Sequence, residues 1–358
     1  MIPENKKIAV LHPQVVEVWG AVKMMFHLYK QISKQNKVVF FTTNLNSKWF
    51  KEIPKIIEVK TKIKFISYLI LAYKIKDFDY VIAWNSPMHF VGVLSKIFFQ
   101  AKFKLFWWNH HYPWYHNKKH SNLFISLKRF LERKSIKYID LFIANSQYIK
   151  DSLIDIFNLQ SRQIKILYPV VSQIFEKNDC RQSRQNKKIT LFTYSRWDKW
   201  KNLWVIFKMY DTLSTKYDFN ILIWWEGIEL EKYKNKYSSC KRISFMWRLC
   251  EEDILKYSSE SHIFLFPSLI DSFWISILEM MFCSLPIIWF NSWWVSELIK
   301  NWKNGFLCNS DLDFIQKTEK LILDKELREK MSIESYNIAI SKFKSNNFIL
   351  SLKEIFKN

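Results

Sequence analysis

Short apolar segments that suit strands alternate with amphipathic segments that suit helices along most of the chain. Strict alternation of this kind predicts parallel sheets with helices packed on both faces. The alternation breaks in one polar, charged stretch and then restarts. We therefore expect an α/β protein of two doubly wound, Rossmann-like domains that face each other across a cleft. The expected divisions are an N-terminal domain over 1–172, a linker over 173–187, a C-terminal domain over 188–340 and a C-terminal helix over 341–358 that packs back toward the N-terminal domain.

Glycine, which such a fold needs at its strand-to-helix turns, is almost missing. The chain has 4 glycines and 17 tryptophans in 358 residues, whereas glycine usually makes up about 7% of a protein. These turns require residues that accept positive φ and that let a ligand approach the backbone. Several of them carry tryptophan instead, so the composition conflicts with the fold that the pattern predicts.

Positive charge is concentrated in the first half of the chain. The formal net charge is +22, and residues 1–180 hold 28 lysines and arginines against 12 acidic residues. A surface of this sign attracts nucleic acid, anionic lipid head groups or phosphorylated substrates, and charge by itself favours none of them. A basic nucleic-acid-binding protein is therefore one function that the composition allows.

Cysteine usage and apolar runs bear on location. The five cysteines form no CxxC pair, which is typical of reduced thiols in the cytoplasm. The N-terminus has no signal-peptide core, and the longest apolar run, 65–73, is about half the length that spans a bilayer. We expect a cytoplasmic protein that could lie at the inner face of the plasma membrane. The basic helix expected over 61–76 could lie on that membrane, but we favour a helix that covers the sheet with its lysines outward.

The stretch 263–308 holds the clearest candidate site. A strand-like run, Ile263 to Phe266, is followed by a loop with Asp271, and a helix-like run then leads through Glu279. Ligand groups in α/β folds lie beyond the ends of strands. Both carboxylates are therefore placed to reach one ligand.

A second candidate site lies just after the strand expected over 188–195. Arg196 and Lys201 lie five residues apart on one loop, where a bidentate guanidinium and a lysine point charge could hold one phosphate group. Two solvated charges on a loop of a basic protein would give the same pattern. FMWRL at 245–249 likewise ends a strand, and it could lie beside a base or sugar or be an ordinary strand end.

The order of these pieces carries more information than any one of them. The chain reads SRWDKWKNL, then a strand with a glycine turn, FMWRL, EEDIL, FPSLIDSFWISILEMM, and VSELI followed by NGFL. In this order it resembles the family 4, or group 1, retaining glycosyltransferases of GT-B fold, closely over 188–308 and more loosely before that. The family has two glutamates with seven residues between them. Asp271 and Glu279 keep that spacing, with a first side chain one methylene shorter.

The resemblance implies a role for each candidate residue. Arg196 and Lys201 would bind the diphosphate of a nucleotide-sugar donor, while Asp271 would bind the transferred sugar and Glu279 the ribose. Two residues near the start of the chain would lie next to the diphosphate: Gly20 and Trp19. The remaining contacts to the sugar, ribose and base would come from Phe273, Trp274, Ile275, Ser276, Leu249, Trp224 and Trp225.

Two adjacent histidines, His110 and His111, follow the strand expected over 102–109. The family has a histidine near this point, close to the donor sugar, so the resemblance implies that His110 is catalytic, with His111 a secondary candidate. Alternatively, both histidines pack an aromatic loop together with residues 112–115. The resemblance implies no metal and no cofactor, because cations such as Arg196 and Lys201 can stabilise the leaving diphosphate.

The resemblance also gives the tryptophans a meaning. The family has glycine at or near nine positions that are all tryptophan here: 19, 200, 224, 225, 247, 274, 293, 294 and 302. Random substitution would scatter over many residue types. We therefore expect that one codon, UGA, is read as glycine in the source organism and as tryptophan in this translation. Trp114, Trp49 and one of Trp107 and Trp108 look like genuine tryptophans.

The resulting expectation is an enzyme that transfers a sugar from a UDP- or GDP-sugar to a hydroxyl acceptor in cell-envelope glycan or lipid-linked sugar synthesis. Its partners would be the donor, bound mainly by the C-terminal domain, a glycan or lipid-linked acceptor, and an anionic membrane contacted by the N-terminal domain. Nucleic acid is not expected as a partner, since that function leaves the two carboxylates without a purpose. A GT-B sugar-nucleotide epimerase and an inactive relative are the alternatives within the fold.

Overall fold

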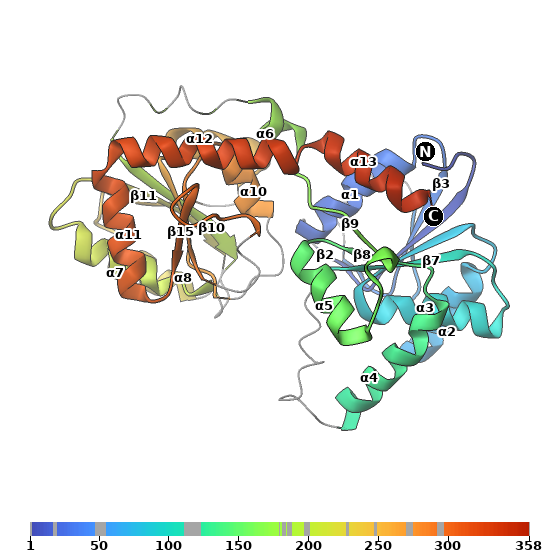
Figure 1. The fold of residues 1–358 in the computed structure, drawn as a ribbon. Coiled ribbons are helices and arrows are strands. Elements are labelled where there is room, and N and C mark those ends of the chain that lie inside the picture. The colour runs from blue at the N-terminus through green and yellow to red at the C-terminus, as the bar shows by residue number, and fades with distance from the viewer. Residues whose placement is uncertain are drawn as a thin grey trace. The chain divides into compact units, whose positions relative to one another are not determined.

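The computed structural model describes residues 2–16, 20–46, 55–110, 123–178, 180, 184, 188–196, 201–226, 229–246, 249–269, 275–291 and 297–357. The chain divides into two compact units (Figure 1). The N-terminal unit holds Met1–Pro169 together with Asn346–Asn358, and the C-terminal unit holds Val170–Ser345. Each unit is built around its own sheet of parallel strands.

The N-terminal unit has a seven-stranded parallel sheet. Its central strands are short apolar runs with few exposed residues, as expected of a parallel sheet that is covered on both faces. In sheet order the strands are β5 (Ile56–Glu58), β3 (Lys37–Thr42), β1 (Lys7–His12), β6 (Tyr80–Trp84), β7 (Lys104–Asn109), β8 (Leu141–Ala144) and β9 (Ile164–Ile166). Two short strands, β2 (Val15–Val16) and β4 (Leu45–Asn46), pair separately.

Helices cover both faces of this sheet. Trp107 of β7 contacts His89 of α3 (Asn85–Phe98) and Phe157 of α5 (Gln147–Phe157). The preceding residue, Phe106, contacts Phe356 of α13 (Ser345–Phe356). Successive residues of a strand point to opposite faces, so α13 lies on the face opposite to α3 and α5. The other helical elements of this unit are α1 (Gly20–Ile32), α2 (Lys64–Lys74), α4 (Leu123–Ser135), η2 (Ile136–Tyr138) and η3 (Ser161–Gln163).

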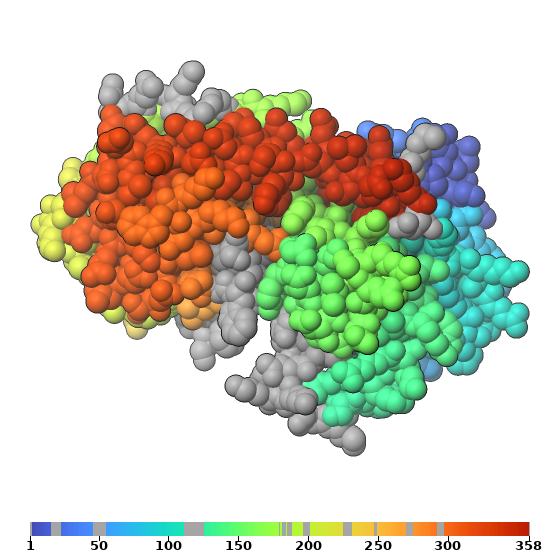
Figure 2. Space-filling view, in the orientation of Figure 1, coloured from blue at the N-terminus to red at the C-terminus, as the bar shows by residue number. Residues whose placement is uncertain are grey.

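The C-terminal unit has a six-stranded parallel sheet. In sheet order its strands are β12 (Ile243–Met246), β11 (Asn220–Glu226), β10 (Thr190–Arg196), β13 (Ile263–Phe266), β14 (Ile287–Phe290) and β15 (Gly305–Cys308). Its helices are α6 (Gln173–Lys177), α7 (Trp204–Leu213), α8 (Glu229–Lys236), α9 (Glu251–Glu260), α10 (Ile275–Phe282), α11 (Asp311–Leu323) and α12 (Lys325–Lys342). In Figure 2 the orange and red segments that include α11 and α12 form much of the visible surface of this unit.

The two parallel sheets confirm the fold class that the alternation predicts. Individual elements differ at their borders: the basic helix, for example, spans 64–74 rather than 61–76. Neither this helix nor any other in the described ranges has both the length and the apolar character that crossing a membrane requires. Residues Gln173–Lys177, expected in the linker, form α6. This short helix is anchored by Phe175, which is fully buried. One buried side chain produces no periodicity, so the sequence pattern gives no sign of the helix.

One of the few glycines lies where no other residue fits. A Cβ atom at Gly305 would lie 2.1 Å from the carbonyl oxygen of Ile287 on the neighbouring strand β14. That separation is far inside van der Waals contact, so any side chain would push β15 away from β14. The glycine of the NGFL motif is therefore required by sheet packing.

Candidate active site

Glu279 is a buried carboxylate whose position is fixed by a tyrosine. It lies on α10 with 1% of its surface exposed, and the hydroxyl of Tyr194 on β10 donates a hydrogen bond to its Oε2. Burial, and then the Glu279 carboxylate, raise the pKa of Tyr194 well above its usual range. The Tyr194 hydroxyl therefore stays protonated and can donate at any physiological pH.

Lys201 lies near the ends of two adjacent strands. Its ammonium nitrogen is 5.3 Å from the ring centroid of Phe266, the last residue of β13. Strand β13 pairs with β10, whose last residue is Arg196. The structure describes the backbone of Arg196 but not its side chain. Lys201 thus lies at the carboxyl edge of the sheet, where α/β folds bind ligands and where a cation can stabilise an anionic group.

Four further predicted residues lie close to this edge or lead toward it. Trp224 of β11 is half-buried, and its ring centroid is 6.4 Å from that of Tyr194. Ile275, which is buried, and Ser276 begin α10, while Leu249 is half-buried just before α9. The structure therefore places Trp224 beside the ring of Tyr194, whose hydroxyl donates to Glu279.

The remaining predicted residues are not described well enough to place their side chains. Gly20 begins α1 and Trp225 belongs to β11, each with only its backbone described. Outside the described residues lie Trp19, His111, Asp271, Phe273 and Trp274. The roles that the resemblance implies for these residues stay predictions.

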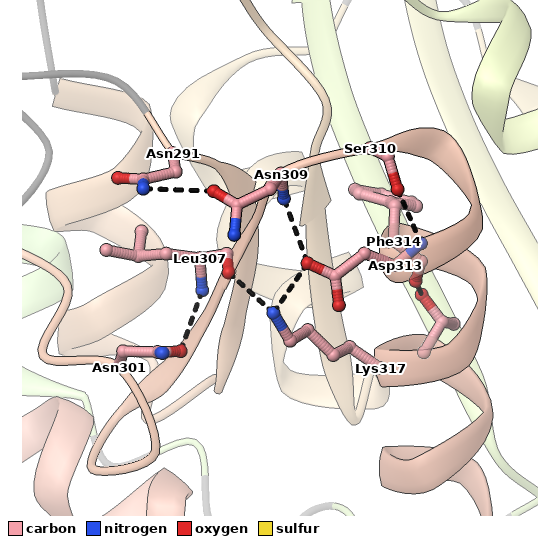
Figure 3. A network of polar contacts seen from close by, with 9 residues as sticks. Asn291, Asn301, Leu307, Asn309, Ser310, Asp313, Phe314 and Lys317 are labelled. Atoms are coloured by element: carbon pink, nitrogen blue, oxygen red, sulfur yellow. Dashed lines mark hydrogen bonds and ion pairs between the residues drawn. The ribbon is translucent and has the colours of Figure 1, made fainter.

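A polar network holds the carboxyl ends of β14 and β15 (Figure 3). Asp313 Oδ2, on α11, accepts hydrogen bonds from the backbone nitrogen of Asn309 at 2.9 Å and from Lys317 Nζ at 2.7 Å. Lys317 also donates to the carbonyl oxygen of Leu307 at 2.7 Å, and Asn291 Nδ2 donates to Asn309 Oδ1 at 3.0 Å. These bonds link the segments that follow two neighbouring strands, so they stiffen the same edge of the sheet that holds Lys201.

His110 is held by two side chains that directly follow the neighbouring strands β6 and β8 of the N-terminal sheet. Its backbone nitrogen donates to Asn85 Oδ1 at 2.9 Å, and its carbonyl oxygen accepts from Asn145 Nδ2 at 3.2 Å. Its ring stacks on Trp84, with centroids 4.2 Å apart and planes 6° apart, and the residue is 1% exposed. His110 therefore lies at the carboxyl edge of its sheet, as the sequence predicts, in a position fixed by two asparagines that sequence reasoning missed.

The two asparagines should respond differently to the same substitution. Asn85 only accepts from His110, so Asn85→Asp keeps the bond, and aspartate tolerates the φ of 55° at this position. Asn145 is 2% exposed and donates, so Asn145→Asp would set a carboxylate against a carbonyl oxygen. We expect Asn145→Asp to lower the free energy of unfolding by about 2–3 kcal/mol and Asn85→Asp by less than about 1 kcal/mol. Urea unfolding measures both, and equal losses would contradict the assigned donor and acceptor roles.

Trp302 has a backbone conformation that suits glycine. Its φ is 67°, and its side chain is 54% exposed. The other non-glycine residues of positive φ in the described ranges are asparagine, glutamine or serine. Bulky side chains rarely adopt this region, because Cβ approaches the following carbonyl oxygen. The backbone at 302 therefore agrees with the glycine that the resemblance implies there.

Trp302→Gly should stabilise the protein. Removing the strain of a tryptophan at positive φ should outweigh two costs, namely the larger conformational entropy that glycine gives the unfolded chain and the lost contact with Phe306. The expected net gain in the free energy of unfolding is about 0.5–1 kcal/mol. Trp204→Gly is the matched control, because Trp204 is 43% exposed but begins helix α7, where glycine costs up to about 1 kcal/mol. The unfolding temperature should therefore rise for Trp302→Gly and fall for Trp204→Gly. A lower unfolding temperature in both variants would contradict the expectation that the backbone at 302 favours glycine.

Two family models match the chain. The model described as "Glycosyl transferases group 1" matches residues 175–338, and that described as "Glycosyltransferase Family 4" matches residues 18–173. Together they leave unmatched only the two ends of the chain and one residue between the matches. The chain belongs to the group 1 glycosyltransferases. The domain that this family model covers holds Lys201 and Glu279, two of the described residues to which the resemblance assigns donor binding.

Known proteins support this assignment at the level of fold and class. An uncharacterised 41.2 kDa protein of the cps region of Klebsiella pneumoniae is 24% identical over 64% of this chain and 64% of its own length. The structure of Anabaena HepE with UDP and glucose has a TM-score of 0.79 at 16% identity, covering 99% of this chain and 100% of that one. The lipopolysaccharide outer core galactosyltransferase WaaB has a TM-score of 0.76 at 19% identity, covering 98% and 99%. The fold of this group 1 glycosyltransferase is therefore GT-B.

Proposed function

We propose that this group 1 glycosyltransferase transfers a sugar, with retention of anomeric configuration, from a UDP- or GDP-sugar to a hydroxyl acceptor of a cell-envelope glycan or lipid-linked sugar. The observation that carries the proposal is the placement of Lys201 and Glu279 near the carboxyl edge of one sheet. The UDP and glucose in the HepE structure support the donor class. The cps-region relative and the likeness to WaaB support a cell-envelope product.

Each residue would act by binding or by charge. Lys201 and Arg196 would hold the diphosphate and stabilise the negative charge that grows on it as the sugar departs. Glu279, fixed by Tyr194, would accept hydrogen bonds from the ribose hydroxyls. Asp271 and His110 would bind the transferred sugar. The two cations would neutralise the leaving group themselves, so the proposal includes no metal ion and no cofactor.

The tryptophans at the nine expected glycine positions belong to the same proposal. We infer that they arise from UGA codons that the source organism reads as glycine. The positive φ of Trp302 supports this inference. Sequencing the gene tests it directly: the nine positions should use UGA, whereas Trp114 should use UGG. A UGG codon at the nine positions would refute the inference.

The setting of the reaction completes the proposal. The enzyme would work in the cytoplasm, in peripheral contact with the inner face of the plasma membrane, where a lipid-linked acceptor is accessible. The excess of positive charge in residues 1–180 supports contact with an anionic surface. The acceptor would meet mainly the N-terminal unit and the donor mainly the C-terminal unit.

A donor screen tests the transferase proposal. The full chain with glycine at the nine positions is heated with UDP, UDP-glucose, UDP-galactose or GDP-mannose, and the unfolding temperature is recorded. A true donor at about 100 times its Kd should stabilise the protein by about 2.7 kcal/mol. NMR of the product, or of the slowly hydrolysed sugar, then reports the anomeric configuration. The proposal fails if no nucleotide or nucleotide sugar stabilises the protein.

A further inference from the structure

Arg184 binds the ends of two helices of the C-terminal unit. It belongs to the stretch 173–187, which the sequence predicts to be a linker, and its side chain is half-buried. Its Nη1 donates to the carbonyl oxygen of Ser284 at 2.7 Å, and its Nη2 donates to the carbonyl oxygens of Cys283 and Ser258, the latter at 3.3 Å. Cys283 and Ser284 directly follow helix α10, and Ser258 lies in the last turn of α9. One side chain of the expected linker therefore joins both helix ends.

The carbonyl groups that Arg184 binds need partners from outside their own helices. The last four carbonyl groups of an α-helix have no donor within the helix, and the negative end of the helix dipole favours a cation. At α10 this end is buried: Cys283 is fully buried, and Ser284 is 1% exposed. Ser284 also has a φ of 56°, a left-handed conformation that ends a helix. A guanidinium carries several donors in one plane, so it can satisfy carbonyls of both helices at once.

Helix α10 carries the proposed ribose-binding residue one turn before this end. Glu279 lies four residues before Cys283, whose backbone nitrogen donates to the carbonyl oxygen of Glu279 at 3.0 Å. The side chain of Glu279 is held separately, because its Oε2 accepts from the hydroxyl of Tyr194. Glu279 is therefore fixed at two points. Strand β10 holds its carboxylate, and the end of α10 that Arg184 binds holds its backbone.

Helix α12 holds the turn after α10 with two hydroxyl groups. Ser332 Oγ donates to the carbonyl oxygen of Ser284 at 2.5 Å, and Ser335 Oγ donates to that of Leu285 at 2.8 Å. The turn keeps these two bonds when Arg184 is replaced. We therefore expect a variant at 184 to stay folded, with more freedom at the end of α10.

We propose that Arg184 is a positioning residue that holds Glu279 in place for the ribose hydroxyls of the donor. Without the guanidinium, buried carbonyl groups at the ends of α9 and α10 lose a hydrogen-bond donor, and the end of α10 moves toward other donors. Glu279, one turn away, moves with it. A displacement of about 1 Å is enough to weaken hydrogen bonds to a bound ligand. This inference rests on the proposed function, in which Glu279 binds the ribose, and extends it to a residue that touches no substrate.

A comparison of two nucleotides tests the positioning role. The nucleoside diphosphate that the donor screen selects, UDP or GDP, and its 2′,3′-dideoxy form differ only in the ribose hydroxyls. Each is titrated calorimetrically into the full chain with glycine at the nine positions. We expect Arg184→Met to weaken binding of the parent nucleotide about tenfold, the usual loss for a hydrogen bond to a charged group. Binding of the dideoxy form should change by less than about twofold, because it makes no ribose bond to lose.

Two further variants separate positioning from folding. Arg184→Lys keeps the cation and part of the hydrogen bonding, so it should lose less affinity than Arg184→Met while keeping the same difference between the two nucleotides. Should Arg184→Met fail to fold, Arg184→Lys carries the comparison. In a Glu279→Ala chain, Arg184→Met should weaken binding by less than about a further twofold, because the two residues act on the same contact.

Arg328 provides the matched control. It is 8% exposed, and its Nη1 donates to the carbonyl oxygens of Leu321 and Ile322 at 2.6 and 3.3 Å. Arg328 thus binds the end of α11, which carries none of the predicted donor-binding residues. Arg328→Met should lower the unfolding temperature, as Arg184→Met does, because both leave carbonyl groups without a donor. It should change the affinity for either nucleotide by less than about twofold.

The results distinguish the positioning role from the proposed function. A parent chain that binds neither UDP nor GDP would refute the proposed function, and the positioning role with it. If the parent chain binds but Arg184→Met weakens the nucleotide and its dideoxy form equally, the proposed function stands and the positioning role is wrong. An undiminished effect of Arg184→Met in the Glu279→Ala chain would overturn the positioning role in the same way.

Discussion

Glycine at the nine positions now occupied by tryptophan is expected to increase the affinity for UDP at least about 100-fold, or 2.7 kcal/mol. Trp224 is half-buried beside Tyr194, which holds Glu279, so an indole there takes space that the proposed donor needs. Trp302 holds a positive φ, which adds backbone strain to the whole unit. Isothermal titration of UDP into the chain as written and into the nine-glycine chain measures the difference.

A nine-alanine chain is the matched control for this comparison. Alanine also removes the indoles, but it keeps a Cβ atom and so opposes positive φ. If glycine conformation matters as well as space, affinity should rank glycine first, alanine second and tryptophan last. UDP binding that is equally tight in the tryptophan and glycine chains would contradict both the recoding inference and the proposed location of the donor.

The sequence was sufficient to predict the features that repeat along the chain. Alternating strand and helix patterns predict two parallel sheets, and the carboxyl ends of parallel strands share one edge. For this reason Lys201 and His110, each just past a strand, lie where their sequence positions suggest. The periodicity of each segment and the order of the segments along the chain can both be read from one sequence, because neither depends on contacts between distant residues.

Contacts between distant residues could not be predicted in the same way. Tyr194 lies in an apolar strand 85 residues before Glu279, and a strand tyrosine reads as part of the core. Asn85 and Asn145 reach His110 across 25 and 35 residues. Strand neighbours and side-chain directions decide these contacts, and a sequence pattern specifies neither. A serine three residues before Asp313 is a recognisable helix cap, so part of the network in Figure 3 could have been found.

Helix α2 shows a different reason why a sequence pattern cannot predict the whole structure. Its sequence, KFISYLILAYK, is apolar on more than one side, so the expectation of outward lysines described only part of its surface. The structure adds outward Phe65, Ile66 and Tyr73. A nearly uniform apolar run has no clear polar face, and its orientation is set by the core that it meets rather than by its own pattern.

Lys201→Ala is expected to reduce kcat/KM for the nucleotide sugar by about 100- to 1,000-fold, the usual loss when a group that stabilises transition-state charge is removed. Negative charge on the leaving diphosphate grows as the sugar bond breaks, so kcat should fall more than KM rises. Lys201→Arg should retain part of the activity, because the charge remains while its position and geometry change. Single-turnover measurement of donor cleavage separates these effects.

Lys208→Ala provides the control for Lys201→Ala. Lys208 also lies 5.3 Å from an aromatic centroid, that of Trp204, but it belongs to helix α7 and pairs with Asp311 at 3.7 Å. Its side chain is 52% exposed, so its loss should change kcat/KM by less than about twofold and stability by less than about 1 kcal/mol. Equal losses at 201 and 208 would mean that general positive charge, rather than a cation at the end of β13, supports the reaction. A large loss at 201 alone would place the departing diphosphate at the carboxyl edge of the C-terminal sheet.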